Sequence, residues 1–310
     1  MSVLFTFPGQ GSQRPGMLHA LPDHPAASAT LERAHAVLGH DPLQLDHADA
    51  LASTVAVQLC LLIAGVAMAR VLAAEGARPD MVAGLSIGAW PAAVVAGVID
   101  FDDALQLVAL RGRLMEQAYP AGYGMAAIVG LDVAQLEPLI AALHTPDAPL
   151  HLANLNAPTQ LVVAGADSAL ERLMAHARSA GATLTRRLAM SVPSHCALLD
   201  APAAQLAEAL ATHPLCRPGP LYLSGSRGRV LFEVDAIRDD LAFNMARQVH
   251  WHDTVRHAYE RGARLALEMP SGNVLSGLTR PVFSDGRVLC CEHNRLDFLA
   301  QQVACAAAPT

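Results

Sequence analysis

"MVAGLSIGAWPAAVVAGVID", residues 81–100, places a short apolar run directly before a serine that stands between two glycines. Residues 81–86 predict a short buried strand, and a helix is expected to begin at Ile87. A Gly-x-Ser-x-Gly sequence between a strand and a helix is typical of a sharp turn that exposes the serine hydroxyl at the carboxyl end of a sheet. The plainer alternative is that Ser86 only caps the following helix.

The chain on both sides of this stretch alternates between apolar strand-like runs and helical segments. The runs expected as strands cover residues 3–7, 81–86, 221–225, 264–272 and 287–292. The segments expected as helices cover residues 51–75, 100–119, 198–213, 239–249 and 252–263, with further helices beginning at Ile87 and near Leu296. This alternation predicts a mostly parallel sheet with helices on both faces.

The middle of the chain has a different order. Strand-like runs at 124–131, 150–157, 160–166 and 182–190 surround two helical segments, 132–144 and 167–181, which we expect Asp132 and Asp167 to cap. The order β-α-β-β-α-β is that of a ferredoxin-like subdomain. We therefore expect an α/β fold in which residues 1–124 and 191–310 form a large α/β-hydrolase-like domain, and residues 125–190 form an inserted ferredoxin-like subdomain.

Composition narrows the class of protein. A net charge of −7 without a basic tract argues against nucleic-acid binding. The first residues do not have the pattern of a signal peptide, and the longest apolar stretch, Leu59–Ala69, is expected to be a buried helix too short to cross a bilayer. The six cysteines show no CxxC spacing and are expected to be reduced. We accordingly expect a cytoplasmic location, no membrane contact and no metal site.

Nucleophilic use of Ser86 requires a base, because a serine hydroxyl is weakly reactive alone. Among 14 histidines the best placed is His195, in "SVPSHCALLD", at a strand-to-helix junction that follows the inserted subdomain. The loop at residues 8–13 lacks the spacing of a nucleotide site and could instead offer a backbone N–H to an oxyanion. Arg111 lies in an apolar helical run, where it is either solvated beside Arg113 or holds a substrate carboxylate through two parallel hydrogen bonds.

These motifs together resemble the malonyl-CoA:acyl-carrier-protein transacylase family over nearly the whole chain. The resemblance lies in "FPGQGSQ" at 7–13, "GLSIGA" at 84–89, "GVIDFDDALQLVALRGRLM" at 97–115, "MAAIVGL" at 125–131, "NAPTQLVVAG" at 156–165, "SVPSHCALL" at 191–199 and "LEMPSGNVLSGLTR" at 267–280. Several motifs in the family's order and spacing form a specific signal.

The resemblance implies a ping-pong acyl transfer without a permanently bound cofactor. Ser86 would attack the thioester of malonyl-CoA, and His195 would take its proton. His195 would later activate the thiol of a phosphopantetheine-type arm on the partner, an acyl carrier protein. Arg111 would hold the malonyl carboxylate, and the backbone N–H groups of Gln10 and Ile87 would bind the oxyanion.

Further residues follow more loosely from the same resemblance. Gln58 is expected to face the cleft and Asn156 to border the site, although a buried glutamine and a turn asparagine are equally compatible with the sequence. Ser194 and Met115 are expected to line the acyl pocket. His250 is expected to orient the catalytic histidine through its main-chain carbonyl.

The sequence also departs from the family pattern at Leu85, Ala89, His250 and "EMPSG" at 268–272. The form "GLSIGAWPAA" at 84–93 resembles the transacylase (epsilon) subunit of bacterial malonate decarboxylase, which implies a dedicated carrier with a modified dephospho-CoA arm. The alternatives are a malonyl transacylase of fatty-acid or polyketide synthesis, a serine thioesterase or hydrolase, and a non-catalytic carrier-docking subunit. Basic candidates for carrier docking are Arg172, Arg178, Arg186 and Arg187.

Overall fold

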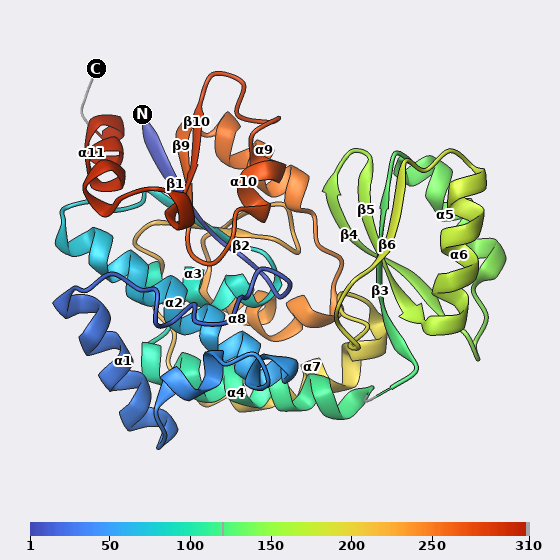
Figure 1. The fold of residues 1–310 in the computed structure, drawn as a ribbon, viewed down its shortest axis with the longest axis horizontal. Coiled ribbons are helices and arrows are strands. Elements are labelled where there is room, and N and C mark those ends of the chain that lie inside the picture. The colour runs from blue at the N-terminus through green and yellow to red at the C-terminus, as the bar shows by residue number, and fades with distance from the viewer. Residues whose placement is uncertain (120, 308–310) are drawn as a thin grey trace.

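Two separate sheets organise the molecule in the computed structural model, which describes residues 1–119 and 121–307 (Figure 1). The larger sheet has six strands in the order β10-β9-β1-β2-β7-β8, and the smaller has four in the order β4-β5-β3-β6. The strands of the larger sheet are β1 (Ser2–Phe7), β2 (Met81–Gly84), β7 (Leu221–Ser224), β8 (Arg229–Leu231), β9 (Ala263–Glu268) and β10 (Arg287–Cys290). All of its neighbouring pairs are parallel except β7 with β8, so the predicted mostly parallel sheet is confirmed.

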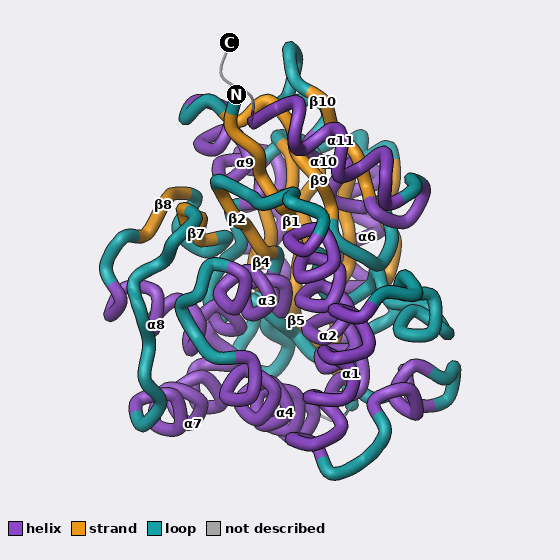
Figure 2. The backbone as a smooth tube through the Cα atoms, turned by 90° about the vertical axis from the view of Figure 1, so that its left-hand side faces the viewer, coloured by secondary structure: helices purple, strands orange, loops and turns teal. Residues whose placement is uncertain are grey.

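Helices cover both faces of the larger sheet. They are α1 (Pro25–Leu38), α2 (Thr54–Ala74), α3 (Ala89–Val95), α4 (Phe101–Ala118), α7 (Asp200–Ala211), α8 (Val234–Phe243), α9 (Trp251–Glu260), α10 (Val274–Thr279) and α11 (Leu296–Ala307). Side chains alternate across β1: Val3 and Phe5 pack with α1–α4, while Leu4 packs with α9 and α10 on the opposite face. Figure 2 shows α1–α4 gathered below β1 and β2 in that view.

Helix α2 is buried in the core of the protein. It is apolar on all sides, which is typical of a helix enclosed by protein or lipid, and 89% of its most apolar window (mean hydropathy 2.2) is buried here. The expectation that this apolar segment is too short to cross a bilayer was wrong, because the helix has 21 residues. The expected buried helix is confirmed. It begins at Thr54 rather than residue 51, because residues Ala50–Ala52 form a 3₁₀ turn and the Ser53 hydroxyl caps the helix.

The smaller sheet is entirely antiparallel and carries two helices on the face turned away from the larger sheet (Figure 1). Its elements are β3 (Tyr123–Val129), α5 (Val133–Leu143), β4 (Leu150–Ala157), β5 (Gln160–Ala166), α6 (Asp167–Ser179) and β6 (Leu184–Arg187). This is the predicted β-α-β-β-α-β order. The domain boundaries after residues 124 and 190 stay a prediction.

Of the two capping residues predicted for the helices of this subdomain, one is confirmed. Asp132 caps α5 as expected, and it forms a reciprocal capping box with Gln135. Asp167 was expected to cap α6 but is the first residue of that helix, and its carboxylate forms an ion pair with Arg187 instead.

The helix predicted at residues 239–249 is wrong in both bounds. Helix α8 ends at Phe243, and residues Asn244–Ala246 form a 3₁₀ turn, η5. The chain is extended after this turn, since Val249 forms a parallel bridge with Asn154 on β4. Residues 244–250 therefore cross from the large sheet to the small one.

Candidate active site

Ser86 occupies a sharp turn at the end of β2. Its φ angle is +58°, in the left-handed region that non-glycine residues rarely adopt. A Cβ atom on Gly84 would lie 2.0 Å from the backbone of Gly88, and one on Gly88 would lie 2.1 Å from the carbonyl oxygen of Phe7. Both glycines are thus required for the backbone to turn so tightly. Ser86 does not cap a helix, because it is the first residue of the 3₁₀ turn η3 (Ser86–Gly88) and Leu85 precedes that turn.

His195 is buried, with 4% of its surface exposed, and its φ angle of +66° is also left-handed. Its Nδ1 lies 2.7 Å from the carbonyl oxygen of Asn244 and 3.2 Å from that of Arg247. Because carbonyls only accept hydrogen bonds, Nδ1 must carry the proton, and Nε2 is left free to accept one. Burial, followed by the charge of Arg111, lowers the pKa of His195 to about 4, so the imidazole is neutral at pH 7.

The orienting role expected for His250 was wrong. The backbone N–H of His250 donates to the carbonyl of Gly225, and its imidazole is one-third exposed beside Asp253. The turn η5 directs the carbonyls of Asn244 and Arg247 toward His195, whereas the carbonyl of His250 accepts from Thr254 in the first turn of α9.

Arg111 is fully buried, which excludes the solvated alternative. Its guanidinium donates to Gln58 Oε1 at 2.6 Å, to Asn244 Oδ1 at 3.1 Å and to Ser86 Oγ at 3.4 Å. No carboxylate pairs with it among the described residues, and burial alone lowers its pKa to about 9. A buried cation held only by neutral acceptors is costly, so the site is suited to an anionic ligand placed next to Ser86.

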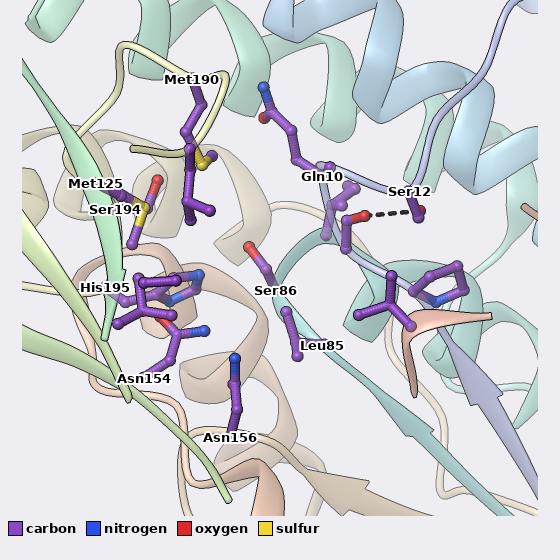
Figure 3. Close-up of a pocket in the computed structure, with 18 of the residues that line it drawn as sticks. Gln10, Ser12, Leu85, Ser86, Met125, Asn154, Asn156, Met190, Ser194 and His195 are labelled. Atoms are coloured by element: carbon purple, nitrogen blue, oxygen red, sulfur yellow. Dashed lines mark hydrogen bonds between the residues drawn. The ribbon is translucent and has the colours of Figure 1, made fainter. Parts of the chain in front are cut away.

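A cavity of about 610 Å³ lies between the two sheets and brings most of the predicted residues together. Ser86, His195, Arg111, Gln10, Ile87, Asn156, Ser194 and Met115 line it, and Figure 3 shows the Ser86 hydroxyl and the His195 ring facing the same space. Within the described residues, Ser86 Oγ accepts a hydrogen bond from the guanidinium of Arg111. No group of three His, Cys, Asp or Glu side chains suited to a metal was found in residues 1–119 and 121–307.

Gln58 lies behind the cavity. It contacts Met115 Sδ through its amide nitrogen and accepts from Arg111 through its oxygen, so it holds the guanidinium in place. Asn154, which the sequence analysis missed, lines the cavity from β4 with an unpartnered buried side-chain oxygen. Its spacing of two residues from Asn156 on one strand was the available signal, because alternate residues share a face.

Gln10 and Ile87, the residues expected to bind the oxyanion through their backbone N–H groups, line the same cavity as Ser86. The N–H of Gln10, in the loop after β1, donates no hydrogen bond within the described chain. Ile87 is the second residue of η3, where N–H groups precede the first intrahelical bond. Neither N–H group donates a hydrogen bond within the described residues, and their role in binding an oxyanion stays a prediction.

Comparison with known proteins covers the same residues. The model of the acyl transferase domain family matches residues 4–284. Malonyl CoA-acyl carrier protein transacylase of Escherichia coli (strain K12) is 40% identical over 286 residues, which are 90% of this chain and 92% of the relative.

Solved structures agree with this match. The malonyl CoA-acyl carrier protein transacylase of Coxiella burnetii has a TM-score of 0.93 at 31% identity, covering 99% of this chain and 98% of that one. A malonyl-transacylase in complex with its type II polyketide acyl-carrier protein has a TM-score of 0.90 at 35% identity, covering 98% and 99%. The fold with its two sheets is therefore shared with these proteins.

Proposed function

The chain belongs to the malonyl-CoA:acyl-carrier-protein transacylase family of acyl transferases, and on that premise we propose that it moves a malonyl group from malonyl-CoA to a carrier protein through a malonyl-Ser86 intermediate. One observation carries the proposal: the buried guanidinium of Arg111, which has no acidic partner in residues 1–119 and 121–307, donates to the hydroxyl of a serine on a strained turn. This pairing fits a substrate with a carboxylate close to its reactive carbonyl.

In the first half-reaction Ser86 Oγ attacks the thioester carbonyl while Nε2 of His195 takes the hydroxyl proton. The backbone N–H groups of Gln10 and Ile87 stabilise the oxyanion that forms. The tetrahedral intermediate then collapses, the carbon–sulfur bond breaks, and the CoA thiolate leaves with the proton from His195. The second half-reaction reverses these steps with the carrier thiol, so thioester exchange requires no additional cofactor.

The malonyl carboxylate also affects the base. The positive charge of Arg111 is one cause of the lowered pKa of His195. A carboxylate bound at Arg111 offsets that charge, so the pKa of His195 rises when malonyl is bound. The correct substrate thereby strengthens the base that activates Ser86.

Mass spectrometry separates this proposal from its rivals. Malonyl-CoA should leave a malonyl adduct on the peptide that contains Ser86, and a carrier thiol should remove it faster than water does. Rapid hydrolysis without an adduct would support a hydrolase. Ser86→Ala should abolish transfer and keep binding, whereas full activity in that variant would leave only a docking role for this chain.

We further propose that the native carrier is that of malonate decarboxylase, located in the cytoplasm. The support is the sequence at 84–93, with Leu85 and Ala89 beside the nucleophile. Kinetics with two carriers test it: a carrier with the modified dephospho-CoA arm should give a higher kcat/KM than a fatty-acid carrier. The reverse preference would place the enzyme in fatty-acid or polyketide synthesis.

Four arginines on the small subdomain were expected to help dock the carrier, and their surroundings differ. Arg178 donates to Thr185, and Arg187 forms an ion pair with Asp167. Arg186 and Arg187 line the cavity, so they are best placed to meet an acidic carrier at its mouth. Arg172 does not line the cavity.

A further inference from the structure

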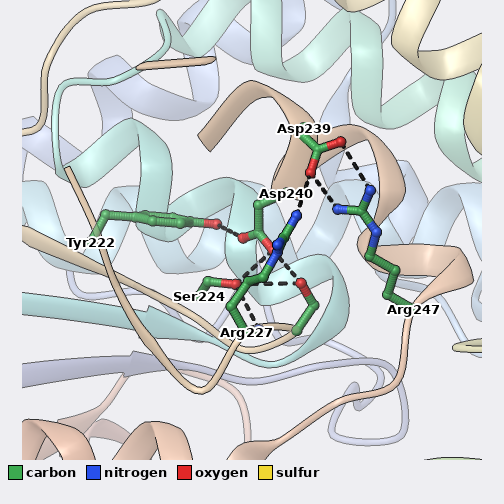
Figure 4. A network of polar contacts seen from close by, with 7 residues as sticks. Tyr222, Ser224, Arg227, Asp239, Asp240 and Arg247 are labelled. Atoms are coloured by element: carbon green, nitrogen blue, oxygen red, sulfur yellow. Dashed lines mark hydrogen bonds and ion pairs between the residues drawn. The ribbon is translucent and has the colours of Figure 1, made fainter. Parts of the chain in front are cut away.

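Two consecutive acids near the end of α8, Asp239 and Asp240, have distinct partners (Figure 4). Asp240 is 1% exposed and accepts from Tyr222 Oη at 2.8 Å, Ser224 Oγ at 2.6 Å and Ser226 Oγ at 2.5 Å. Tyr222 and Ser224 belong to β7, which pairs with β2, the strand that leads to Ser86. Asp240 therefore fixes the end of α8 against the strand beside the nucleophile strand.

Asp239 holds the chain beyond the helix. Its carboxylate accepts from both terminal nitrogens of Arg247, at 2.5 and 2.9 Å, and from Arg227 at 2.8 Å. The guanidinium of Arg247 also lies 4.9 Å from the ring centre of Phe243. The ion pair thus joins the two ends of the segment 239–247, which consists of the end of helix α8, the turn η5 and Arg247. We call this cross-linked segment the loop 239–247.

This loop carries the acceptors of the catalytic histidine. The carbonyls of Asn244 and Arg247 accept from Nδ1 of His195, and the backbone N–H of His195 donates to the carbonyl of Met245 at 2.7 Å. A shift of residues 244–247 would consequently move the imidazole or release its Nδ1 proton.

We propose that Asp239 is a positioning residue for acyl transfer: through Arg247 it holds the carbonyls that orient His195 and keep its Nε2 free toward Ser86. The inference rests on the proposed function, in which His195 is the base. Asp239 touches neither substrate nor the reacting atoms and acts only through its neighbours.

Exposure separates positioning from a contribution to stability. The side chains of Asp239, Arg247 and Arg227 are 37%, 33% and 41% exposed. Ion pairs of this kind add little to folding stability, because water screens them. Removing the carboxylate should leave the protein folded while the loop 239–247 loses its closing contact.

The test compares Asp239→Asn with Asp235→Asn, a matched change at an exposed position of the same helix. We expect Asp239→Asn to lower kcat for malonyl transfer by about tenfold or more, because small displacements of a catalytic group are costly, with KM for malonyl-CoA nearly unchanged. Asp235→Asn should match wild type. Asp239→Glu keeps the carboxylate and should have a higher kcat than Asp239→Asn. Arg247→Lys should have a kcat as low as that of Asp239→Asn, since an ammonium lacks the planar two-pronged geometry of a guanidinium.

A spectroscopic readout accompanies the kinetics. In protein labelled with ¹⁵N-histidine, the His195 signals, assigned with His195→Gln, should show a single Nδ1–H tautomer in wild type and a tautomer mixture in Asp239→Asn. Unchanged signals together with a wild-type kcat in Asp239→Asn would overturn the inference while leaving the proposed function intact. If wild type itself failed to malonylate Ser86, the proposed function would fail, and the ¹⁵N spectra would still decide whether Asp239 orients His195.

Discussion

Replacing Arg111 by alanine should convert the preference for malonyl into a preference for acetyl. The side chain is fully buried, donates to neutral acceptors and has no acidic partner in the described chain. Its free hydrogen-bonding capacity and its charge are therefore directed to the acid end of the substrate. Acetyl-CoA lacks that carboxylate and leaves the guanidinium unpaired in wild type.

The size of the effect follows from the contacts that are lost. Two hydrogen bonds between a guanidinium and a carboxylate, at about 1.5–3 kcal/mol each, give roughly 3–6 kcal/mol. That range corresponds to a decrease of about two to four orders of magnitude in kcat/KM for malonyl-CoA. Acetyl transfer should be retained or raised, because the alanine removes an unpaired buried charge.

The assay measures acyl transfer to a carrier from malonyl-CoA and from acetyl-CoA with the same enzyme preparations. Arg113→Ala, an exposed arginine on the same helix, serves as the matched control and should keep wild-type values for both. Arg111→Gln covers the case in which alanine disturbs folding, since Gln58 and Asn244 retain a polar neighbour. An unchanged malonyl-to-acetyl ratio in folded Arg111 variants would mean that another residue binds the carboxylate.

Three further outcomes are expected. Because the pKa of His195 is lowered to about 4, the imidazole of the free enzyme stays neutral above that pH. The acid limb of kcat/KM for malonyl-CoA should therefore lie near pH 4. An acid limb near pH 6.5, the usual pKa of histidine, would contradict this prediction. Gly88→Ala places a Cβ 2.1 Å from the Phe7 carbonyl oxygen, so it should lower the free energy of unfolding measured in urea by about 1–3 kcal/mol and slow the malonylation of Ser86. The control Gly277→Ala, which has open space around the added Cβ, should change neither value. Charge reversal at Arg186 and Arg187 should raise KM for an acidic carrier with little change for malonyl-CoA in steady-state kinetics, and an equal effect on both substrates would assign these arginines to CoA.

Local patterns were sufficient for most of the fold. The alternation of apolar runs and helical segments predicted both sheets, and Asp132 followed by Gln135 marked a helix start correctly. Helix α1 was missed although Pro25 at its first position and Gly39 after its end are typical boundary signals. Strand β8 has only three residues, too few for a periodic pattern.

The side chains of the site could be predicted from the sequence, but the main-chain groups that orient the histidine could not. Ser86, Arg111 and His195 were identified from motifs, and the structure brings them to one cavity. The histidine's acceptors were assigned to the wrong residue, since a main-chain carbonyl is present at every position. Only the path of the chain through η5 decides that the carbonyls of Asn244 and Arg247 face the imidazole.

The left-handed backbone conformation of Ser86 and His195 lowers the stability of the fold at the two residues that activity requires. Both residues hold conformations that glycine adopts without steric cost and that other residues adopt at about 1–2 kcal/mol. Selection for heat resistance alone would therefore favour glycine or asparagine at the two positions that perform the chemistry. Thermostable variants recovered without an activity screen should be enriched in catalytically dead proteins, so any directed evolution of this scaffold needs turnover as a selected trait.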